Sequence, residues 1–125
     1  MRILLDSHAL LWWAGDPERL APSARAAIED PENEIHVSAA SLWEIGLKAA
    51  KGKLRLPVDF EEILGRNGIN SLALTARHAM ESVGLPPIHG DPFDRVLVAQ
   101  CRVEDMILAS RDAILASYGI RILPV

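Results

Sequence analysis

The sequence predicts an α/β domain in which a mainly parallel β-sheet carries helices on both faces. Short apolar segments with strand character alternate along the chain with amphipathic helical segments, and this order is typical of a parallel sheet. The chain has 125 residues, half of them hydrophobic, which is long enough for one real core. No repeat, low-complexity run or linker divides it. We therefore expect one domain over residues 1–125.

Capping residues and apolar spacing predict the elements of the first half of the chain. Gly15 and Pro17 end a helix, and Pro22 begins another. Ser41 and Glu44 match the capping box, in which a serine and a glutamate satisfy each other's backbone N–H groups. In order, we expect a strand at 2–6, helices at 7–15 and 23–29, a strand at 34–37 and a helix beginning at Ser41.

The same signals predict the second half. Asn67-Gly68 and Gly119 each end a helix, and Thr75 caps one. In order, we expect a helix at 59–66, a strand at 70–74, a helix from Thr75 to about Val83, a loop at 85–90, a helix opening at Asp91, a strand at 106–110, a helix at 112–118 and a strand at 121–123.

The segment HGDPFDRVLVAQ, residues 89–100, organises the rest of the chain. Asp91 is a good N-cap, and Pro92 suits the first helical position because its missing donor is harmless there. Asp94 follows in the first turn, where the helix dipole favours an anion. Asp91 and Asp94 are three residues apart and project to the same side of the helix. Since one carboxylate is enough for the cap, Asp94 is either an ordinary first-turn acid or part of a site.

Five acids fall where strands pass into helices: Asp6, Glu44, Asp91, Asp94 and Asp112. Right-handed crossovers bring such junctions to one edge of a parallel sheet, where ligands bind in open α/β folds. Carboxylate oxygens suit Mg²⁺ or Mn²⁺, which activate water and stabilise charge at phosphorus. Each acid also has a structural explanation as a helix cap, a capping-box partner or a first-turn acid. The prediction of a metal site depends on their convergence.

Other chemically active side chains give weaker signals. The four histidines lack metal-ligand spacing, and only His89, beside the acidic pair, is a candidate for contact with substrate. Arg95 either meets a phosphate or lies over the surface. The apolar setting of Cys101 disfavours a thiolate nucleophile. Three tryptophans on short amphipathic helices are more apolar bulk than a chain of this size hides easily: Trp12, Trp13 and Trp43.

Composition limits the partners and the compartment. A net charge of −4 gives no support for a broadly basic nucleic-acid binder, but permits an enzyme that reaches phosphate through bound metal. No apolar run is long enough to span a bilayer, and the N-terminus does not resemble a targeting peptide. A single cysteine fits a reducing compartment. We expect a cytoplasmic protein without membrane contact.

Four segments in this order resemble the PIN-domain nucleases, in particular the VapC-like toxins of bacterial toxin–antitoxin pairs. They are LLDSHALLWW, SAASLWEIGLKAAKGKL, HGDPFDRVLVAQC, and ILASRD followed by GIRILPV. The resemblance implies a PIN fold and metal-dependent RNA cleavage. By this resemblance Asp6 and Asp94 are the principal ligands of Mg²⁺ or Mn²⁺, and Glu44 completes the acidic site. Asp112 matches the last acid of the family, and Asp91 matches the first acid of the DPFDR motif.

The leading hypothesis is an endoribonuclease that inhibits growth when free of its antitoxin. Water attacks the phosphodiester in line and leaves a 5′-phosphate and a 3′-hydroxyl. We expect an antitoxin complex and a homodimer to bury part of the tryptophan surface, and Ser7 to hold a carboxylate. A small metal-dependent phosphatase is a second reading, weakened because no Asp-x-Asp follows the first strand. A receiver-like or nucleotide-binding module is a third, weakened because no lysine follows the late strand.

Overall fold

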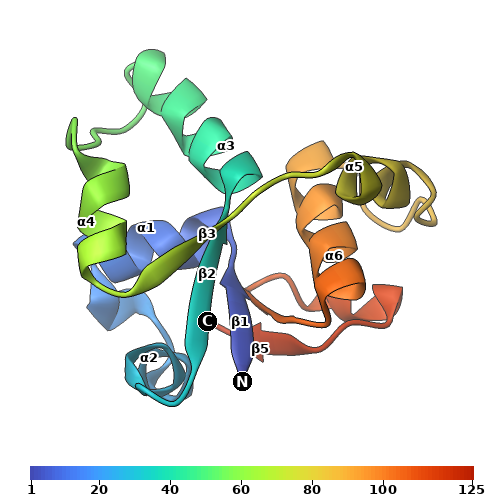
Figure 1. Cartoon of the computed structure of the whole chain (residues 1–125), viewed down its shortest axis with the longest axis horizontal. Coiled ribbons are helices and arrows are strands. Elements are labelled where there is room, and N and C mark those ends of the chain that lie inside the picture. The colour runs from blue at the N-terminus through green and yellow to red at the C-terminus, as the bar shows by residue number, and fades with distance from the viewer.

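Five parallel strands form the central sheet of the computed structural model, which describes residues 1–125 (Figure 1). The strands are β1 (Arg2–Leu5), β2 (Glu34–Ser38), β3 (Ile69–Leu72), β4 (Ile107–Ser110) and β5 (Ile122–Pro124). Their order is β3-β2-β1-β4-β5, and every neighbouring pair is parallel. Helices cover both faces of the sheet, which confirms the predicted fold class.

Eight helical segments connect the strands, close to the positions that the capping residues predict. They are α1 (Ser7–Gly15), η1 (Pro17–Arg19), α2 (Pro22–Glu29), α3 (Ala39–Ala50), α4 (Phe60–Arg66), α5 (Ala76–Val83), α6 (Pro92–Glu104) and η2 (Ala113–Tyr118). The segments η1 and η2 are 3₁₀ helices. None of the helices combines the length and the apolar character that crossing a bilayer demands.

The alternation of side chains along β1 divides the core into two layers. Ile3 and Leu5 pack with residues of α1, α2 and α4 on one face of the sheet. Leu4 points the other way and packs with α6 and η2 around Leu97 and Leu115. The side chains of Ile3, Leu4 and Leu5 are all fully buried. Burying each leucine or isoleucine contributes roughly 1.5–3 kcal/mol, so β1 anchors both layers.

The strand order places a topological switch point between β1 and β4. From β1 the chain moves outward through β2 to β3, and then returns to place β4 on the opposite side of β1. Ligands of open α/β sheets bind beyond the carboxyl ends of the strands at such a point. Asp6 follows β1 directly, and its backbone N–H donates to the carbonyl of Ala109 in β4 at 3.0 Å. The fold therefore brings the ends of β1 and β4 together.

The start of α3 differs from the predicted capping box at Ser41 and Glu44. The helix begins directly after β2, with Ser38 as its N-cap, and the Ser38 Oγ accepts from the backbone N–H of Ala40 at 3.0 Å. Ser41 is already inside the helix, and its buried hydroxyl has no hydrogen-bond partner. Glu44 consequently lies in the second turn, where it has no capping role and projects toward the end of β1. The capping-box prediction is wrong because the strand passes into the helix without a loop.

Replacing the two serines by alanine tests this assignment. Ser38→Ala should lower the free energy of unfolding by about 1 kcal/mol, since it removes an N-cap. Ser41→Ala should leave stability unchanged or raise it, because the lost hydroxyl is buried and unpaired. Urea unfolding followed by circular dichroism gives both values. A larger loss for Ser41→Ala than for Ser38→Ala would restore Ser41 as the cap.

Candidate metal centre

The first turn of α6 separates the roles of its two aspartates. The Asp91 Oδ1 accepts from the backbone N–H groups of Phe93 at 2.8 Å and Asp94 at 3.4 Å. Pro92 occupies the first turn, as its sequence position predicts. Since Asp91 already satisfies the end of the helix, the Asp94 carboxylate is not needed there. It projects into a polar cavity at the carboxyl edge of the sheet.

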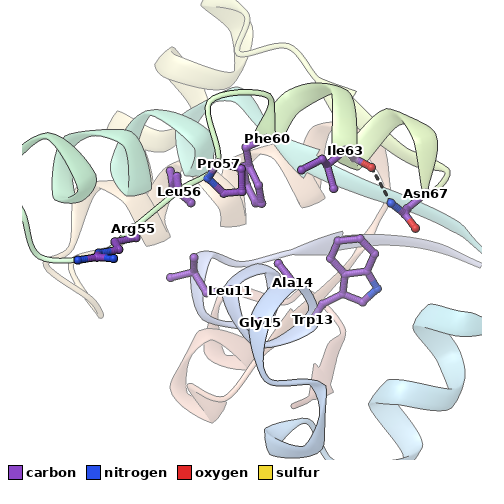
Figure 2. A pocket seen from close by; sticks show the side chains of 10 residues that line it. All are labelled: Leu11, Trp13, Ala14, Gly15, Arg55, Leu56, Pro57, Phe60, Ile63 and Asn67. Carbon is purple, nitrogen blue, oxygen red and sulfur yellow. Dashed lines mark hydrogen bonds between the residues drawn. The ribbon is translucent and has the colours of Figure 1, made fainter.

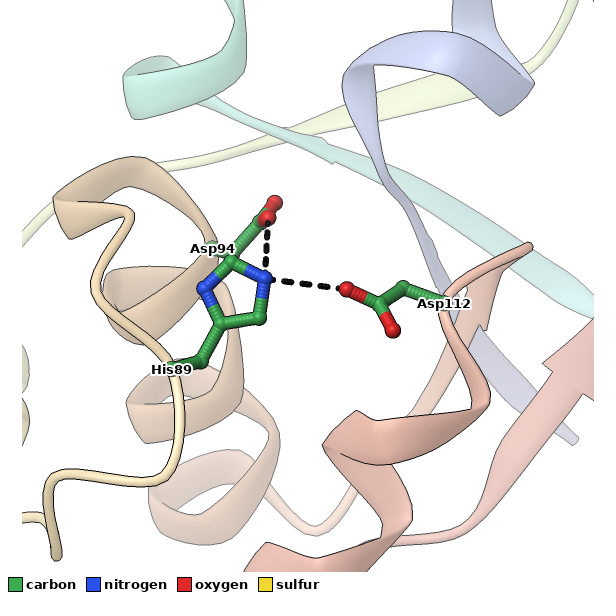
Figure 3. A group of neighbouring side chains, drawn as sticks. All are labelled: His89, Asp94 and Asp112. Carbon is green, nitrogen blue, oxygen red and sulfur yellow. Dashed lines mark hydrogen bonds and ion pairs between the residues drawn. The ribbon is translucent and has the colours of Figure 1, made fainter.

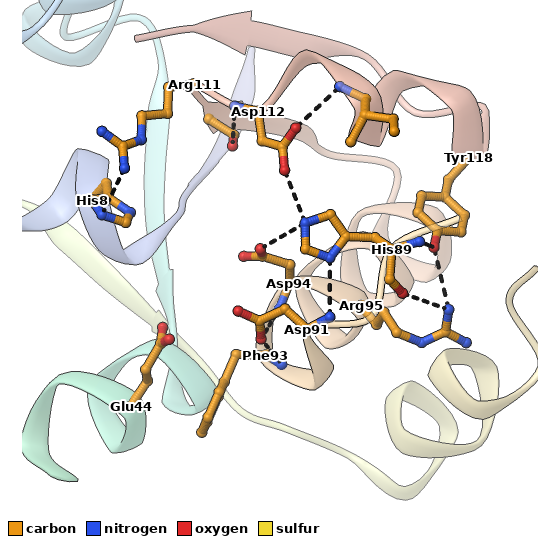
Figure 4. Close-up of polar contacts among 12 residues, drawn as sticks. His8, Glu44, His89, Asp91, Phe93, Asp94, Arg95, Arg111, Asp112 and Tyr118 are labelled. Carbon is orange, nitrogen blue, oxygen red and sulfur yellow. Dashed lines mark hydrogen bonds and ion pairs between the residues drawn. The ribbon is translucent and has the colours of Figure 1, made fainter. Parts of the chain in front are cut away.

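A cavity of about 310 Å³ gathers all five acids that the sequence singles out. Figure 4 shows Glu44, Asp91, Asp94 and Asp112 among its side chains. None of its lining residues is hydrophobic. They come from the ends of β1 and β4, from α1 and α3, and from the loop into α6: Asp6, Ser7, His8, Glu44, Lys48, His89, Asp91, Asp94, Ser110, Arg111 and Asp112. The convergence expected from right-handed parallel topology is therefore present.

Asp6 and Glu44 form the wall between β1 and α3. Asp6 is only 5% exposed, and its Oδ1 accepts from the backbone N–H of Ala9 at 2.8 Å. Burial nevertheless raises the pKa of Asp6, because desolvation outweighs that hydrogen bond. Glu44 accepts a hydrogen bond from the Ser7 Oγ, as expected for Ser7, and lies 3.7 Å from the Lys48 Nζ. Both carboxylates are thus fixed by short local contacts.

Asp94 is the most strongly perturbed acid of the cavity. Burial raises its pKa to about 6, the neighbouring carboxylate of Asp91 adds to the shift, and Asp6 and Glu44 contribute in the same direction. His89 opposes the shift without cancelling it. Neighbouring carboxylates and burial both disfavour the ionised form of the Asp94 carboxylate, and a nearby cation stabilises it. The cavity therefore favours a bound cation.

Three side chains meet on the opposite wall of the cavity (Figure 3). The His89 Nε2 lies 2.9 Å from the Asp112 Oδ2 and 3.5 Å from the Asp94 Oδ2. One potential ligand atom from each of these residues lies within 4.8 Å of the other two. By distance alone His89 qualifies as a metal ligand.

The backbone beside His89 assigns it a different role. The backbone N–H of Asp91 donates to the His89 Nδ1 at 3.1 Å, so this nitrogen carries no proton. In the neutral imidazole the proton then sits on Nε2, which donates to Asp112. A protonated ring nitrogen has no free lone pair for a metal. His89 is therefore a hydrogen-bond donor that orients Asp112, and the available metal ligands are the carboxylate oxygens.

Arg95 and Tyr118 fix the loop that carries His89. The Arg95 guanidinium donates to four backbone carbonyls, those of Ser82, Leu85, Pro86 and His89, and to the Tyr118 hydroxyl. The Tyr118 hydroxyl accepts from the backbone N–H of His89 at 2.8 Å and donates to the Pro86 carbonyl at 3.0 Å. Arg95 follows Asp94 on α6, and Tyr118 ends the helix after Asp112. The loop is thus attached to both elements that carry acids of this wall.

These contacts correct the expectation for Arg95 and identify Tyr118, which the sequence did not single out. Arg95 neither meets a phosphate nor lies over the surface, because its donors are used by loop carbonyls. Tyr118 stands six residues after Asp112, and no sequence pattern connects it with His89. The proximity of His89 to the DPFDR motif was the only available signal for its role. Cys101 is buried, and burial raises its pKa to about 12, which disfavours the reactive thiolate.

A second, apolar groove of about 440 Å³ runs between α1 and the segment that leads into α4 (Figure 2). Its lining is mostly hydrophobic: Leu11, Trp13, Ala14, Gly15, Arg55, Leu56, Pro57, Phe60, Ile63 and Asn67. No residue of this groove lines the acidic cavity. Trp12 and Trp13 pack partly against the core, whereas Trp43 on α3 is 61% exposed.

Comparison with known proteins agrees with this geometry. The PIN domain profile matches residues 3–120. Ribonuclease VapC22 of Mycobacterium tuberculosis (strain ATCC 25618 / H37Rv) is 31% identical over 119 residues, covering 93% of this chain and 91% of that protein. The chain belongs to the PIN domain family. This confirms the resemblance noted from the four sequence segments.

Solved structures of other proteins share the fold. The crystal structure of VapBC2 from Rickettsia felis, bound to a DNA fragment from their promoter, matches with a TM-score of 0.69 at 12% identity, covering 99% of this chain and 98% of that one. FitAcB from Neisseria gonorrhoeae matches with a TM-score of 0.62 at 17% identity, covering 97% and 96%. The chain thus shares its overall fold with these two proteins.

The raised pKa of Asp94 predicts how the metal-free protein responds to pH. In the unfolded chain this pKa is about 3.9, so the folded state holds the proton more tightly. The contribution of this proton to the free energy of unfolding is fully present below about pH 4 and is lost as the pH rises toward about 6. The amide introduced by Asp94→Asn cannot titrate, so the variant does not lose this contribution. In EDTA, the melting temperature of the variant minus that of wild type should therefore increase from about pH 4 to about pH 6 and then level off.

Thermal melting by circular dichroism across this range measures the difference. Asp59→Asn is the matched control, because Asp59 lies on the entry to α4 outside the cavity and pairs with Arg66. The difference in melting temperature between Asp59→Asn and wild type should not show this increase with pH. A flat or decreasing difference for Asp94→Asn would contradict the crowding of acids around Asp94.

Proposed function

We propose that residues 1–125 act as a single PIN domain that cleaves RNA endonucleolytically with a divalent metal ion, as the toxin of a toxin–antitoxin pair. One observation carries the proposal: five carboxylates line a cavity without a hydrophobic side chain. No hydrogen bond joins a serine of the cavity to a histidine, and the cavity holds no cysteine: Ser7 donates to Glu44, and the Ser110 Oγ accepts from the backbone N–H of Asp112. Similarity over most of the chain to a ribonuclease supports RNA as the substrate.

The donor set fits Mg²⁺ or Mn²⁺. Both ions prefer oxygen ligands and are held by one or two carboxylates together with water and substrate phosphate. Asp6 and Asp94 are the acids whose pKa burial raises in the cavity, so they gain most from a cation. We assign them as the principal metal ligands. A bound divalent ion supplies an activated water and compensates charge that develops on the phosphate.

The remaining acids are assigned roles in orienting the attacking water or the metal ligands. Ser7 and Lys48 fix Glu44, and His89 fixes Asp112. Both acids face the same cavity, where they would hold a second ion or orient the attacking water. Asp91 shapes the site through its cap, because the cap sets the direction of Asp94. Attack of water on phosphorus in line with the leaving oxygen yields a 5′-phosphate and a 3′-hydroxyl.

Incubation of purified protein with RNA tests the proposal. Cleavage should require Mg²⁺ or Mn²⁺, stop in EDTA, and fall at least about 100-fold in Asp6→Asn and Asp94→Asn, because even indirect perturbation of a metal site lowers activity 10–100-fold. These variants should also gain less melting temperature from Mn²⁺ than wild type does. Asp59→Asn is the control that should retain both responses. Cleavage of equal rate in excess EDTA, or hydrolysis of a chromogenic phosphate ester without RNA cleavage, would contradict the proposal.

We also propose that the apolar groove between α1 and α4 binds an apolar helix of an antitoxin. The VapBC2 assembly is bound to promoter DNA. This chain carries a net charge of −4, so a partner would have to supply the basic surface that DNA requires. The groove offers apolar side chains for such a partner, among them Leu11, Leu56 and Ile63. The expected homodimer, for which Trp43 leaves apolar surface on α3, stays a prediction.

Two neighbouring substitutions test the groove. Leu56→Glu places a charge in the groove and should abolish co-purification with the product of the adjacent gene. Val58→Glu makes a similar change two residues away, on a fully exposed side chain outside the groove, and should leave co-purification intact. Retention of the partner by both variants would show that the groove is not its binding site.

A further inference from the structure

Trp12 holds two arginines beside the acidic cavity. The guanidinium carbons of Arg19 and Arg111 lie 5.0 and 5.6 Å from the centroid of the Trp12 ring. The Arg111 Nη2 also lies 3.3 Å from the His8 Nε2, and the His8 ring contacts Trp12 edge-on. Because Trp12 packs against the hydrophobic core, it gives both arginines a fixed support.

These two arginines are not bound to carboxylates. Ion pairs occupy Arg25, Arg66 and Arg102. The Arg95 donors are used by loop carbonyls, and Lys48 lies beside Glu44. Arg19 and Arg111 make no ion pair of this kind. Asp16 and Glu18 precede Arg19, but both are fully exposed to water, which screens their attraction. Arg19 and Arg111 therefore remain available to an anionic ligand.

Trp12 connects Arg19 with the margin of the acidic cavity, because Arg111, which lies over the same indole ring, lines that cavity. His8 and Arg111 belong to the cavity lining, and Figure 4 shows them on the side away from Arg95 and Tyr118. Trp12 follows His8 by one helical turn on α1, and Arg19 ends η1 beyond it. A polymer with one phosphate in the cavity would bring a neighbouring phosphate to Arg111 and a further one to Arg19 on the same indole ring.

We propose that Arg111 and Arg19, supported by Trp12, bind successive phosphates of a single-stranded RNA next to the cleaved bond. This inference rests on the proposed function. Guanidinium groups suit phosphate because they present several donors in one plane. An anionic substrate approaching five carboxylates needs nearby cations. Arg111 lines the cavity, Arg19 shares its indole support, and neither is in an ion pair with a carboxylate. We call residues Trp12, Arg19 and Arg111 the arginine track.

A competing explanation is that Arg111 only compensates the acids. His8 and Arg111 do lower the pKa of Asp6 against the effect of burial. This explanation does not account for Arg19, which lies outside the cavity lining, or for its placement on the same indole ring. It also makes a different prediction, because loss of Arg111 would then change metal binding and leave RNA binding intact.

The salt dependence of RNA binding tests the arginine track. The probe is a short fluorescein-labelled single-stranded RNA, bound to an Asp94→Asn protein so that it stays uncleaved, with affinity measured by anisotropy at several salt concentrations. Each phosphate contact with a single strand contributes about −0.7 to the slope of log affinity against log salt. Arg19→Gln and Arg111→Gln should each reduce the slope by about 0.7, and the double variant by about 1.4.

Arg77→Gln is the matched control, because Arg77 is an exposed arginine on α5 with the same charge. Its slope should equal that of the parent protein. Arg111→Lys, which keeps the charge, should restore most of the slope and serves if the glutamine variant fails to fold. An unchanged slope in the double variant, or higher Mn²⁺ affinity of Arg111→Gln without loss of RNA binding, would overturn the proposal. Failure of wild-type protein to cleave RNA would instead contradict the proposed nuclease function.

Discussion

Crowding of carboxylates at the carboxyl edge of the sheet is the constraint on which the rest of the structure depends. Asp6 and Asp94 are held in a partly dehydrated cavity where burial raises the pKa of each and where the acids repel one another. A fold gains nothing from this arrangement in the absence of a cation. The free energy lost there has to be offset elsewhere, and the side chains of β1, which are buried on both faces of the sheet, contribute to that.

The side chains around the acids act mainly by restricting movement. Ser7 and Lys48 hold Glu44, while His89 holds Asp112. Arg95 and Tyr118 in turn hold the loop that carries His89. Ligands fixed in this way do not have to be ordered when a metal or substrate binds, and affinity and rate both benefit from that preorganisation. Arg19 and Arg111, on the Trp12 ring, stand outside this network and are exposed to solvent.

The sequence was sufficient for the features that depend on local chemistry. Asp91 and Pro92 define the start of α6 through rules that act within one helical turn, and alternating elements define a parallel sheet. That topology alone brings Asp6, Asp94 and Asp112 to one edge. Sequence reasoning was insufficient where two local signals compete. Ser38 and Ser41 are both possible N-caps, and the length of the β2–α3 connection decides between them. Sequence reasoning also could not reveal the Arg95 and Tyr118 contacts, which join segments distant in sequence through backbone carbonyls that any residue provides.

The most direct measurement is the position of the metal itself. Anomalous diffraction from a crystal soaked in Mn²⁺ locates the ion without assuming its ligands. We expect a peak in the acidic cavity with carboxylate oxygens of Asp6 and Asp94 among its ligands, at about 2.1 Å as is usual for octahedral oxygen sites. The His89 Nε2 should stay outside the coordination sphere and keep its hydrogen bond to Asp112. A peak outside this cavity, or one coordinated by His89 without Asp6, would contradict the carboxylate metal centre.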